Sequence, residues 1–397
     1  MTDQVDQIQV AVVDPSGYSL PYDTMLCNSL VDSGDHIIDP NTTVGVSLLT
    51  TSDRRSDAWD LPVPNFDYVP RYYRWSSNIS DPELVRLLIK SGEHIIDQAR
   101  LVSNANYDIY HIQWAPIAAV DWLVLRLLRS RKPVVLTVHN VLPHESTILD
   151  SASRQLLYQS VDHLVVHTNS SKERLMKNFG VCEGNISVIP HGNFRYMNEF
   201  KLQMDSLPTK VRELSERPTM LAFGLVREYK RLDIAIQALA IVQETIPNAA
   251  LLVAGDTRTE MSKYYDLVEE LGLESDVIFF SEYISDELVP SVFELADVCV
   301  FPYEDIDQSG AALLAATLGK PIVASDIAGF RDIVIPEETG KLVGKDPKEL
   351  AEAVSHILSD PALRRRLAVS VAEHANDEFA WEDIASRTLS LYLDLIK

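Results

Sequence analysis

Short apolar runs rich in β-branched residues alternate with helical patterns along the whole chain. The runs cover residues 10–14, 44–49, 108–113, 134–139, 163–167, 186–190, 219–223, 250–254, 277–280, 298–301 and 321–324. Helical patterns lie between them, as at 233–245 and 348–358. This alternation is typical of parallel sheets that helices cover on both faces. We therefore predict an α/β fold with two sheets in two domains, because one sheet holding all of these strands is less favourable.

The strand pattern is interrupted over residues 194–218, which are irregular and broken by prolines. We therefore expect a first domain over residues 1–200 and a second over 206–378. The last segment, 379–397, has apolar residues at helical spacing and is predicted to form one helix.

The chain of 397 residues has 58 Asp and Glu against 35 Lys and Arg, a net charge of −23. A nucleic-acid-binding protein normally carries a basic domain, so we expect no nucleic-acid partner. The acid excess fits a salt-adapted protein and an ordinary cytosolic one equally well. Three scattered cysteines, Cys27, Cys182 and Cys299, favour a reducing compartment over a disulfide framework or a zinc site. The N-terminus does not resemble a signal peptide, and no apolar run reaches the roughly 18 residues of a membrane span.

Several common motifs are absent or incomplete. The first strand is not followed by G-x-G-x-x-G, and no G-x-S-x-G occurs. Gly319-Lys320 resembles the end of a phosphate-binding loop, but Pro321 follows where Ser or Thr would bind magnesium. His163 and His167 flank a predicted strand instead of lying on a helix, so we expect packed or surface histidines there and no zinc site.

Two cations follow the first strand of the second half. Arg227 and Lys230 lie after Gly224, between the strand at 219–223 and the helix at 233–245. Ligands of an open α/β sheet bind at the carboxyl ends of its strands. Arg offers a planar fork to phosphate oxygens and Lys a point charge, so the pair could bind a diphosphate. An ordinary solvated charged turn is the alternative.

Ser309-Gly310 opens the predicted apolar helix at 311–318, after the strand at 298–301. The N-terminus of a helix attracts anions, and a glycine there lets them approach the backbone N–H groups closely. A plain serine N-cap is the alternative.

Polar and aromatic side chains follow two predicted strands of the first half. They are His111, Trp114, His139 and His144. Because strand ends of one parallel sheet share an edge, we expect these residues to face the same crevice. A histidine at such a place has either a structural or a catalytic role.

Taken in order, several segments resemble family 4 of the retaining glycosyltransferases. They are the Thr-x-His-Asn…Pro-His-Glu stretch at 137–145, Ile-Pro-His-Gly at 189–192, the loop at 223–230, the segment 308–325 and Trp-Glu-Asp-Ile at 381–384. The resemblance covers nearly the whole chain. It implies a GT-B fold of two Rossmann-like domains whose parallel sheets face a cleft. It further implies a nucleotide-sugar donor on the second domain, an acceptor on the first, and a last helix that completes the first domain.

The resemblance also implies roles for individual residues. Arg227, Lys230 and the helix start at Ser309-Gly310 would neutralise the departing diphosphate without a metal ion. His139 matches the histidine that contacts the donor sugar. The donor-binding residues would be Gly17, Gly224, Asp307, Gln308, Ser309 and Gly310. His111, Trp114 and His144 would lie on the acceptor side.

The chain departs from the family at two positions. Many members carry two glutamates eight residues apart, and alignment on Gly319-Lys320-Pro321 puts Ile306 and Leu314 there. Neither side chain accepts a hydrogen bond. A subgroup with a Ser-Gly motif also lacks the second glutamate, which normally holds the ribose. Asp305 or Asp307 could replace the sugar contact.

Two segments of the first half combine basic and apolar residues. One is the predicted helix near 117–130 with the cations that follow it, and the other is the cluster at 71–75. Both could touch a membrane surface or a lipid-linked acceptor. A buried helix with a cation-rich C-terminus is the alternative.

We therefore predict a metal-independent retaining glycosyltransferase of polysaccharide or glycolipid biosynthesis. It would transfer a sugar from a nucleotide-diphosphate sugar to a glycan or lipid-linked glycan, without a cofactor, in the cytoplasm or at the inner face of the membrane. Other GT-B enzymes, such as a sugar-nucleotide epimerase or a phosphorylase, are the first alternative. The second is a binding subunit without catalysis. Ile306 and Leu314 favour it, whereas His139, Arg227 and Lys230 together oppose it.

Overall fold

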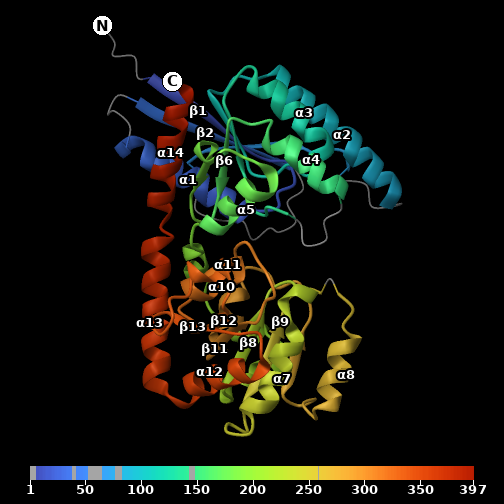
Figure 1. The fold of residues 1–397 in the computed structure, drawn as a ribbon, viewed down its shortest axis with the longest axis vertical. Coiled ribbons are helices and arrows are strands. Elements are labelled where there is room, and N and C mark those ends of the chain that lie inside the picture. Colours follow the sequence, from blue (N-terminus) through green and yellow to red (C-terminus); the bar gives the residue numbers. More distant parts are fainter. Residues whose placement is uncertain (1–5, 38–41, 52–64, 77–82, 143–147, 258) are drawn as a thin grey trace. The chain divides into compact units, whose positions relative to one another are not determined.

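The computed structural model describes residues 6–37, 42–51, 65–76, 83–142, 148–257 and 259–397 (Figure 1). The chain divides into two compact units, and each is built around one parallel sheet. The first unit comprises residues up to 192 together with 381–397, and the second comprises 193–380.

The sheet of the first unit has the strand order β3-β2-β1-β4-β5-β6-β7, and all of its pairs are parallel. Its strands are β1 (Asp6–Asp14), β2 (Thr42–Thr51), β3 (Asp67–Tyr72), β4 (Ile109–Ile112), β5 (Val134–Thr137), β6 (His163–Val166) and β7 (Ile186–Val188). The order reverses between β1 and β4. Open α/β sheets bind ligands at the carboxyl ends of the strands beside such a switch point.

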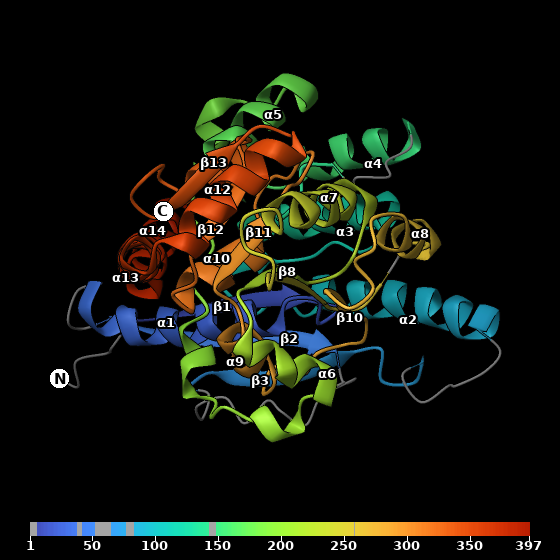
Figure 2. The ribbon, with the colours of Figure 1, turned by 90° about the horizontal axis from the view of Figure 1, so that it is seen from below.

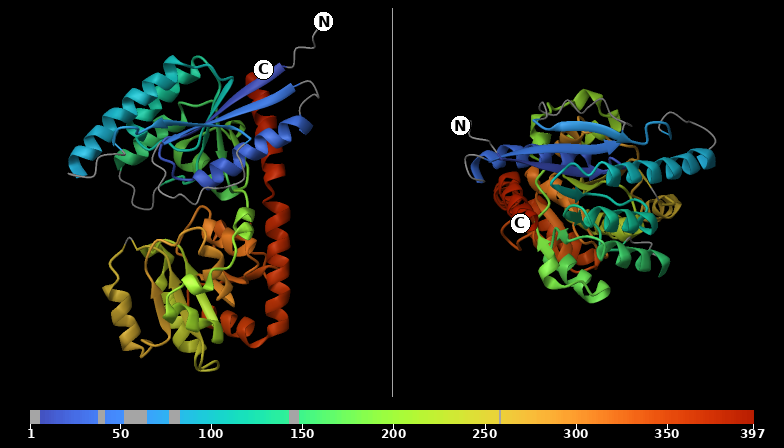
Figure 3. Two further views of the ribbon diagram at one scale, coloured as in Figure 1. Left: turned by 180° about the vertical axis from the view of Figure 1, so that it is seen from behind. Right: turned by 90° about the horizontal axis from the view of Figure 1, so that it is seen from above.

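Helices cover this sheet, and buried apolar residues of several of them join those of its strands in one core. They are α1 (Leu20–Ile37), α2 (Glu83–Ser103), α3 (Ala118–Arg129), α4 (Ile148–Tyr158), α5 (Asn169–Phe179) and α14 (Trp381–Ile396). The last helix of the chain packs against α1, while α2, α3 and α4 lie side by side (Figure 3). The final segment of the chain thus belongs to the first unit.

The second unit has a parallel sheet with the order β10-β9-β8-β11-β12-β13. Its strands are β8 (Thr219–Phe223), β9 (Ala250–Ala254), β10 (Val277–Phe280), β11 (Val298–Phe301), β12 (Ile322–Ser325) and β13 (Gly340–Val343). Its order reverses between β8 and β11, which places a second switch point there.

Helices also pack on both sides of the second sheet. They are α6 (Thr209–Arg212), α7 (Leu232–Val242), α8 (Ser262–Glu270), α9 (Val289–Glu294), α10 (Gly310–Thr317), α11 (Ala328–Arg331), α12 (Pro347–Ser359) and α13 (Pro361–Glu378). Helices α7 and α12 are neighbours (Figure 2), and their apolar residues join those of β8, β9 and β11 in one core.

All of the apolar runs predicted as strands are confirmed. Strands β3 and β13 were not predicted from the sequence. Both are edge strands; β3 contains Pro70, and β13 has only four residues. Edge strands are only half covered and therefore lack the continuous apolar run of a central strand. In the basic and aromatic cluster at 71–75, Tyr72 and Tyr73 are buried in the core and so are not available to a membrane surface. None of the described helices is long and apolar enough to cross a membrane.

Candidate active site

Four histidines gather at the carboxyl edge of the first sheet. One lies in β4, and the others follow the neighbouring strands β5, β6 and β7: His111, His139, His167 and His191. The ring of His167 lies 5.0 Å from that of His139 and 5.5 Å from that of His191, centroid to centroid. Tyr22 of α1 packs against the last three rings at 4.7–5.7 Å. These elements bring together four imidazoles from segments far apart in sequence.

The hydrogen bonds of the cluster determine its tautomers. Nδ1 of His167 lies 3.0 Å from the carbonyl oxygen of Ile189, which can only accept, so Nδ1 carries the proton. The neutral ring then accepts at Nε2, where Nδ1 of His139 lies 3.1 Å away and donates. His139 is therefore left with an unprotonated Nε2.

Gln113 completes this chain of hydrogen bonds. Oε1 of Gln113 lies 3.2 Å from Nε2 of His139, and in this tautomer both atoms are acceptors, so we assign the amide in the flipped orientation, in which its nitrogen donates to the ring. This orientation also gives a partner to that nitrogen, which in the opposite orientation is buried without one. The carbonyl of Ile189 thus orients His139 through His167, and Gln113 holds the far side of the ring.

Burial keeps the cluster neutral. It lowers the pKa of His167 to about 4 and that of His191 to about 3. The pKa of His139 also lies well below its usual value, mainly through burial and further through the neighbouring His167. At neutral pH the rings therefore serve as hydrogen-bonding groups and not as cations.

The indole ring of Trp114 covers one face of the His139 ring. The two rings are stacked at 4.7 Å with an angle of 10° between their planes. The indole N–H donates to the hydroxyl of Ser19 at 2.7 Å, which anchors the ring to the loop after β1. Tyr18, whose side chain is exposed, packs on the outer side of Trp114 at 5.2 Å. Trp114 thus lies between His139 and an exposed tyrosine.

His111 has a different environment from the other predicted residues. Its Nδ1 lies 2.6 Å from the hydroxyl of Tyr392 in α14, and its Nε2 lies 2.7 Å from the hydroxyl of Thr137 in β5. Both ring nitrogens are therefore used inside the unit, where they attach the last helix to the sheet. His144 lies outside the described residues.

Gly17 forms part of a tight loop after β1. It adopts φ +60°, and its N–H donates to the carboxylate of Asp14 at 3.0 Å. The N–H groups of Ser16 and Ser19 donate to the same carboxylate. The loop is thus closed on a buried acid at the switch point of the first sheet.

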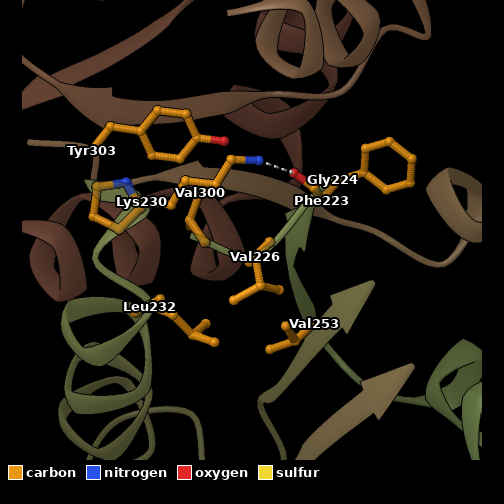
Figure 4. Close-up of a pocket in the computed structure, with 11 residues that line it drawn as sticks. Phe223, Gly224, Val226, Lys230, Leu232, Val253, Val300 and Tyr303 are labelled. Atoms are coloured by element: carbon orange, nitrogen blue, oxygen red, sulfur yellow. Dashed lines mark hydrogen bonds between the residues drawn. The ribbon is translucent and has the colours of Figure 1, made fainter. Parts of the chain in front are cut away.

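The second sheet has a pocket at its own switch point, between the ends of β8 and β11. The pocket has a volume of about 330 Å³ including its open mouth, and its lining includes Phe223, Gly224, Val226, Lys230 and Tyr303. Figure 4 shows the amine of Lys230 pointing at the Phe223 carbonyl beneath the Tyr303 ring. The Nζ–O distance is 3.4 Å, and Nζ lies 5.3 Å from the ring centroid. Of the two cations predicted to bind a diphosphate, Lys230 thus lines a pocket at the carboxyl end of β8.

Gly224 makes room for this cation. Its φ of +96° lies in the region that favours glycine, and a Cβ there would lie 3.1 Å from Nζ of Lys230. Burial, with a further contribution from Arg227, lowers the pKa of Lys230 to about 8. An anionic ligand would compensate for this loss of solvation.

The predicted helix start at Ser309 is confirmed as the start of α10. The hydroxyl of Ser309 accepts the N–H of Ala312 at 3.2 Å, so the side chain is an N-cap. The first N–H groups of the helix, at Gly310 and Ala311, cannot be paired by the helix itself. Asp307 is buried in the preceding loop, and Gln308 is half-buried.

Apolar side chains occupy the two positions where the resemblance places glutamates. Leu314 is buried within α10. Ile306 packs against Gly329 of α11, where a Cβ would overlap the Ile306 carbonyl. Neither position supplies a polar side chain to the second unit.

His167 is the residue that sequence reasoning set aside and the structure places at the centre of the cluster. A signal was present, since His111, His139 and His167 follow one another at intervals of 28 residues, one per strand-helix unit. Tyr22 had no such signal, because it comes from a helix and meets the histidines only through the fold.

Known proteins resemble this chain in sequence and in fold. Residues 46–192 match the family described as glycosyltransferase family 4, and residues 204–373 match glycosyl transferases group 1. The D-inositol 3-phosphate glycosyltransferase of Corynebacterium diphtheriae is 27% identical over 307 residues, which are 72% of this chain and 71% of that protein.

Two solved structures superpose on nearly the whole chain. Sucrose-phosphate synthase from Thermosynechococcus elongatus matches with a TM-score of 0.71 at 22% identity, over 98% of this chain and 99% of its own. HepE from Anabaena, solved with UDP and glucose, matches with a TM-score of 0.71 at 18% identity, over 98% and 100%. The protein is a glycosyltransferase, and its two Rossmann-like units form the GT-B fold, as the sequence predicted.

Proposed function

We propose that this glycosyltransferase transfers a sugar from a nucleotide-diphosphate sugar with retention of configuration and without a divalent metal ion. The observation that carries the proposal is Lys230, a half-buried cation held at the mouth of a pocket at the β8–β11 switch point. HepE, which shares the fold, is described in complex with UDP and with UDP-glucose, so UDP-sugars are the first donors to test.

The residues of the second unit would stabilise the leaving group. Negative charge develops on the diphosphate as the glycosidic bond breaks, and preorganised donors act most strongly where charge develops. Lys230 and Arg227 would supply positive charge, and the first N–H groups of α10, which the helix itself does not pair, would supply further donors. These groups perform the neutralisation for which other enzymes use a metal ion.

His139 would contact the donor sugar from the first unit. Its ring is neutral, so it can lie beside a sugar that develops positive charge without placing a second cation there. We further propose that Gly17, Gly224, Asp307, Gln308 and Gly310 lie around the donor, and that Trp114 lies on the acceptor side. For the acceptor we propose a glycan or a lipid-linked glycan, reached in the cytoplasm or by peripheral contact with the membrane.

A donor-hydrolysis assay tests the proposal. The purified protein is incubated with a panel of UDP-, GDP- and ADP-sugars, with and without EDTA, and the anomer released is followed by NMR. We expect one nucleotide class to be hydrolysed, with retention and without loss in EDTA. An epimerase would release an epimerised nucleotide sugar, and a binding subunit would release nothing.

Variants connect this activity to the pocket. Arg227→Ala and Lys230→Ala should each cost about 2–4 kcal/mol of transition-state stabilisation, as for other preorganised charges. Lys263→Ala is the matched control, because Lys263 is exposed on α8 and pairs with Glu228 at 2.7 Å. Near-normal turnover in the Arg227→Ala, Lys230→Ala double variant would contradict the proposal that these two cations stabilise the departing diphosphate.

A further inference from the structure

Helix α2 turns its polar side chains inward and its apolar side chains outward. Glu93, His94, Asp97 and Gln98 are buried against the first unit. Leu88 is 73% exposed and Ile95 is 50% exposed. A helix on the surface of a globular protein normally has the opposite arrangement. Figure 3 shows this helix along the outside of the unit.

Specific hydrogen bonds hold the polar face inward. The carboxylate of Glu93 accepts the N–H groups of Trp75 and Ser76 at 2.9 and 3.0 Å. Nε2 of His94 lies 2.7 Å from Asp121 of α3, and its Nδ1 lies 3.0 Å from the hydroxyl of Tyr73. Rotating α2 would leave these buried groups unpaired, which costs more than exposing an apolar side chain.

The outward side chains form a continuous stripe. They lie at helical spacing and are all exposed: Val85, Leu88, Ile89, Ile95 and Ile96. At 1.5 Å per residue, positions 85 to 96 span about 17 Å. The neighbouring α3 adds Leu123 and Leu127, which are also about half exposed.

The charges around the stripe are basic. Arg86 and Arg126 are exposed, and Lys90 is half-buried. Beyond Glu83 at the start of α2, the acids of α2 and α3 are Glu93, Asp97 and Asp121, and all three are buried. In a chain of net charge −23, the exposed charged side chains of positions 85–103 and of α3 are therefore cationic.

We propose that α2 lies in the plane of an anionic lipid bilayer, with the stripe in the acyl boundary and the cations at the headgroups. Interfacial helices combine an apolar face with basic residues in this way. A second copy of the chain is a poorer occupant, because a stripe of about 17 by 10 Å is far below the roughly 800 Å² per partner of a stable dimer. This proposal rests on the proposed function, because binding to the membrane would give the enzyme access to a lipid-linked acceptor.

Vesicle flotation with the full chain tests the proposal. Vesicles of phosphatidylcholine alone are compared with vesicles that also contain phosphatidylglycerol. We expect binding only to the anionic vesicles, weakened by salt, and reduced about tenfold or more in Leu88→Ser, Ile96→Ser. Arg86→Gln, Arg126→Gln should weaken binding to a smaller extent. Val369→Ser is the matched control, because Val369 is 53% exposed on α13 of the second unit.

Two outcomes would overturn the proposal. One is equal flotation of the wild type and the Leu88→Ser, Ile96→Ser variant. The other is a wild-type dimer in analytical ultracentrifugation that this variant dissociates, which would assign the stripe to a second copy. Donor hydrolysis without acceptor is measured in the same variant and should be unchanged. Loss of vesicle binding and failure of the proposed function are thereby distinguished.

Discussion

Nε2 of His167 accepts the Nδ1–H of His139 across 3.1 Å, and this one bond sets the tautomer of His139. The proton on His167 is in turn held at Nδ1 by the carbonyl of Ile189, 3.0 Å away. The backbone carbonyl of Ile189, in the loop after β7, therefore determines which nitrogen of His139 can accept a hydrogen bond. His167 acts in this account as a positioning residue for His139.

We expect His167→Leu to lower kcat while leaving the KM for the donor nearly unchanged. Leucine cannot accept a hydrogen bond, so the Nδ1–H of His139 loses its partner, at a cost of about 1–3 kcal/mol or roughly a 5- to 150-fold loss of rate. Nitrogen-15 NMR of the ring should show His139 shifting away from the Nδ1–H tautomer.

Two further variants make this test specific. His167→Gln places a carbonyl oxygen near the same site and should restore part of the activity. His163→Leu is the control on the same strand, because His163 bonds to Ser187 at 2.9 Å outside the cluster. An equal loss of kcat in His163→Leu would mean that His167 has only a packing role.

We expect donor use to weaken as the pH rises through about 8. The pKa of Lys230 is lowered to about 8, so its ammonium loses its proton there, whereas an ordinary lysine keeps it to about 10.4. Only the protonated form attracts the diphosphate. A pH profile of kcat/KM should therefore fall above this pH.

Lys230→Arg should remove this alkaline limb, because a guanidinium stays protonated throughout the range, even if its larger side chain lowers the activity. Lys263→Arg, a change at an exposed lysine of α8, should keep the limb. A profile that is flat in the wild type would exclude Lys230 from donor binding.

Leu314 leads us to expect weak discrimination between ribose and 2′-deoxyribose. Charge-assisted bonds from a glutamate to ribose hydroxyls would be worth about 1.5–3 kcal/mol each, and a buried leucine cannot form them. Competitive inhibition by matching ribo- and deoxyribonucleoside diphosphates should therefore differ by less than about tenfold, or 1.4 kcal/mol. A preference far above a hundredfold would show that a neighbour such as Asp307 has replaced the glutamate.

We expect the stability of the first unit to fall as the pH drops from about 6.5 towards 4. Burial lowers the pKa of His191 to about 3, so below 6.5 the unfolded chain takes up a proton that the folded chain does not. Each such histidine contributes a slope of about 1.4 kcal/mol per pH unit in this window. His191→Gln should therefore lower the slope of unfolding free energy against pH by about this amount.

Urea unfolding between pH 7.5 and 5 measures this slope, followed by tryptophan fluorescence. The tryptophans of the chain, at 59, 75, 114, 122 and 381, all belong to the first unit, so the signal reports that unit. Asp14 and Asp23 have raised pKa values, so they stabilise the folded unit as the pH falls. This contribution is the same in the wild type and in His191→Gln and therefore cancels in the comparison. His356→Gln, at an exposed position of α12, is the control and should leave the slope unchanged.

The buried strands could be read from the sequence because each is a local run. Thr219–Phe223 and Val298–Phe301 are apolar along their whole length, as expected of strands covered on both faces. Their order then places Gly224 and Lys230 at a strand end, and the pocket there contains both. Edge strand β3 was missed because polar residues and Pro70 interrupt it.

The sequence by itself determined the α/β class, the strand ends and the chemical groups placed after them, because these depend on neighbours within a few residues. Only the tertiary structure decided that His167 controls His139 and that α2 faces outward with its apolar side. The first depends on β5, β6 and β7 lying side by side. The second depends on partners such as Asp121, which lies 27 residues beyond His94. Helical spacing alone would predict that the apolar stripe of α2 faces inward. The buried hydrogen bonds of its polar side chains outweigh the free energy gained by burying that stripe.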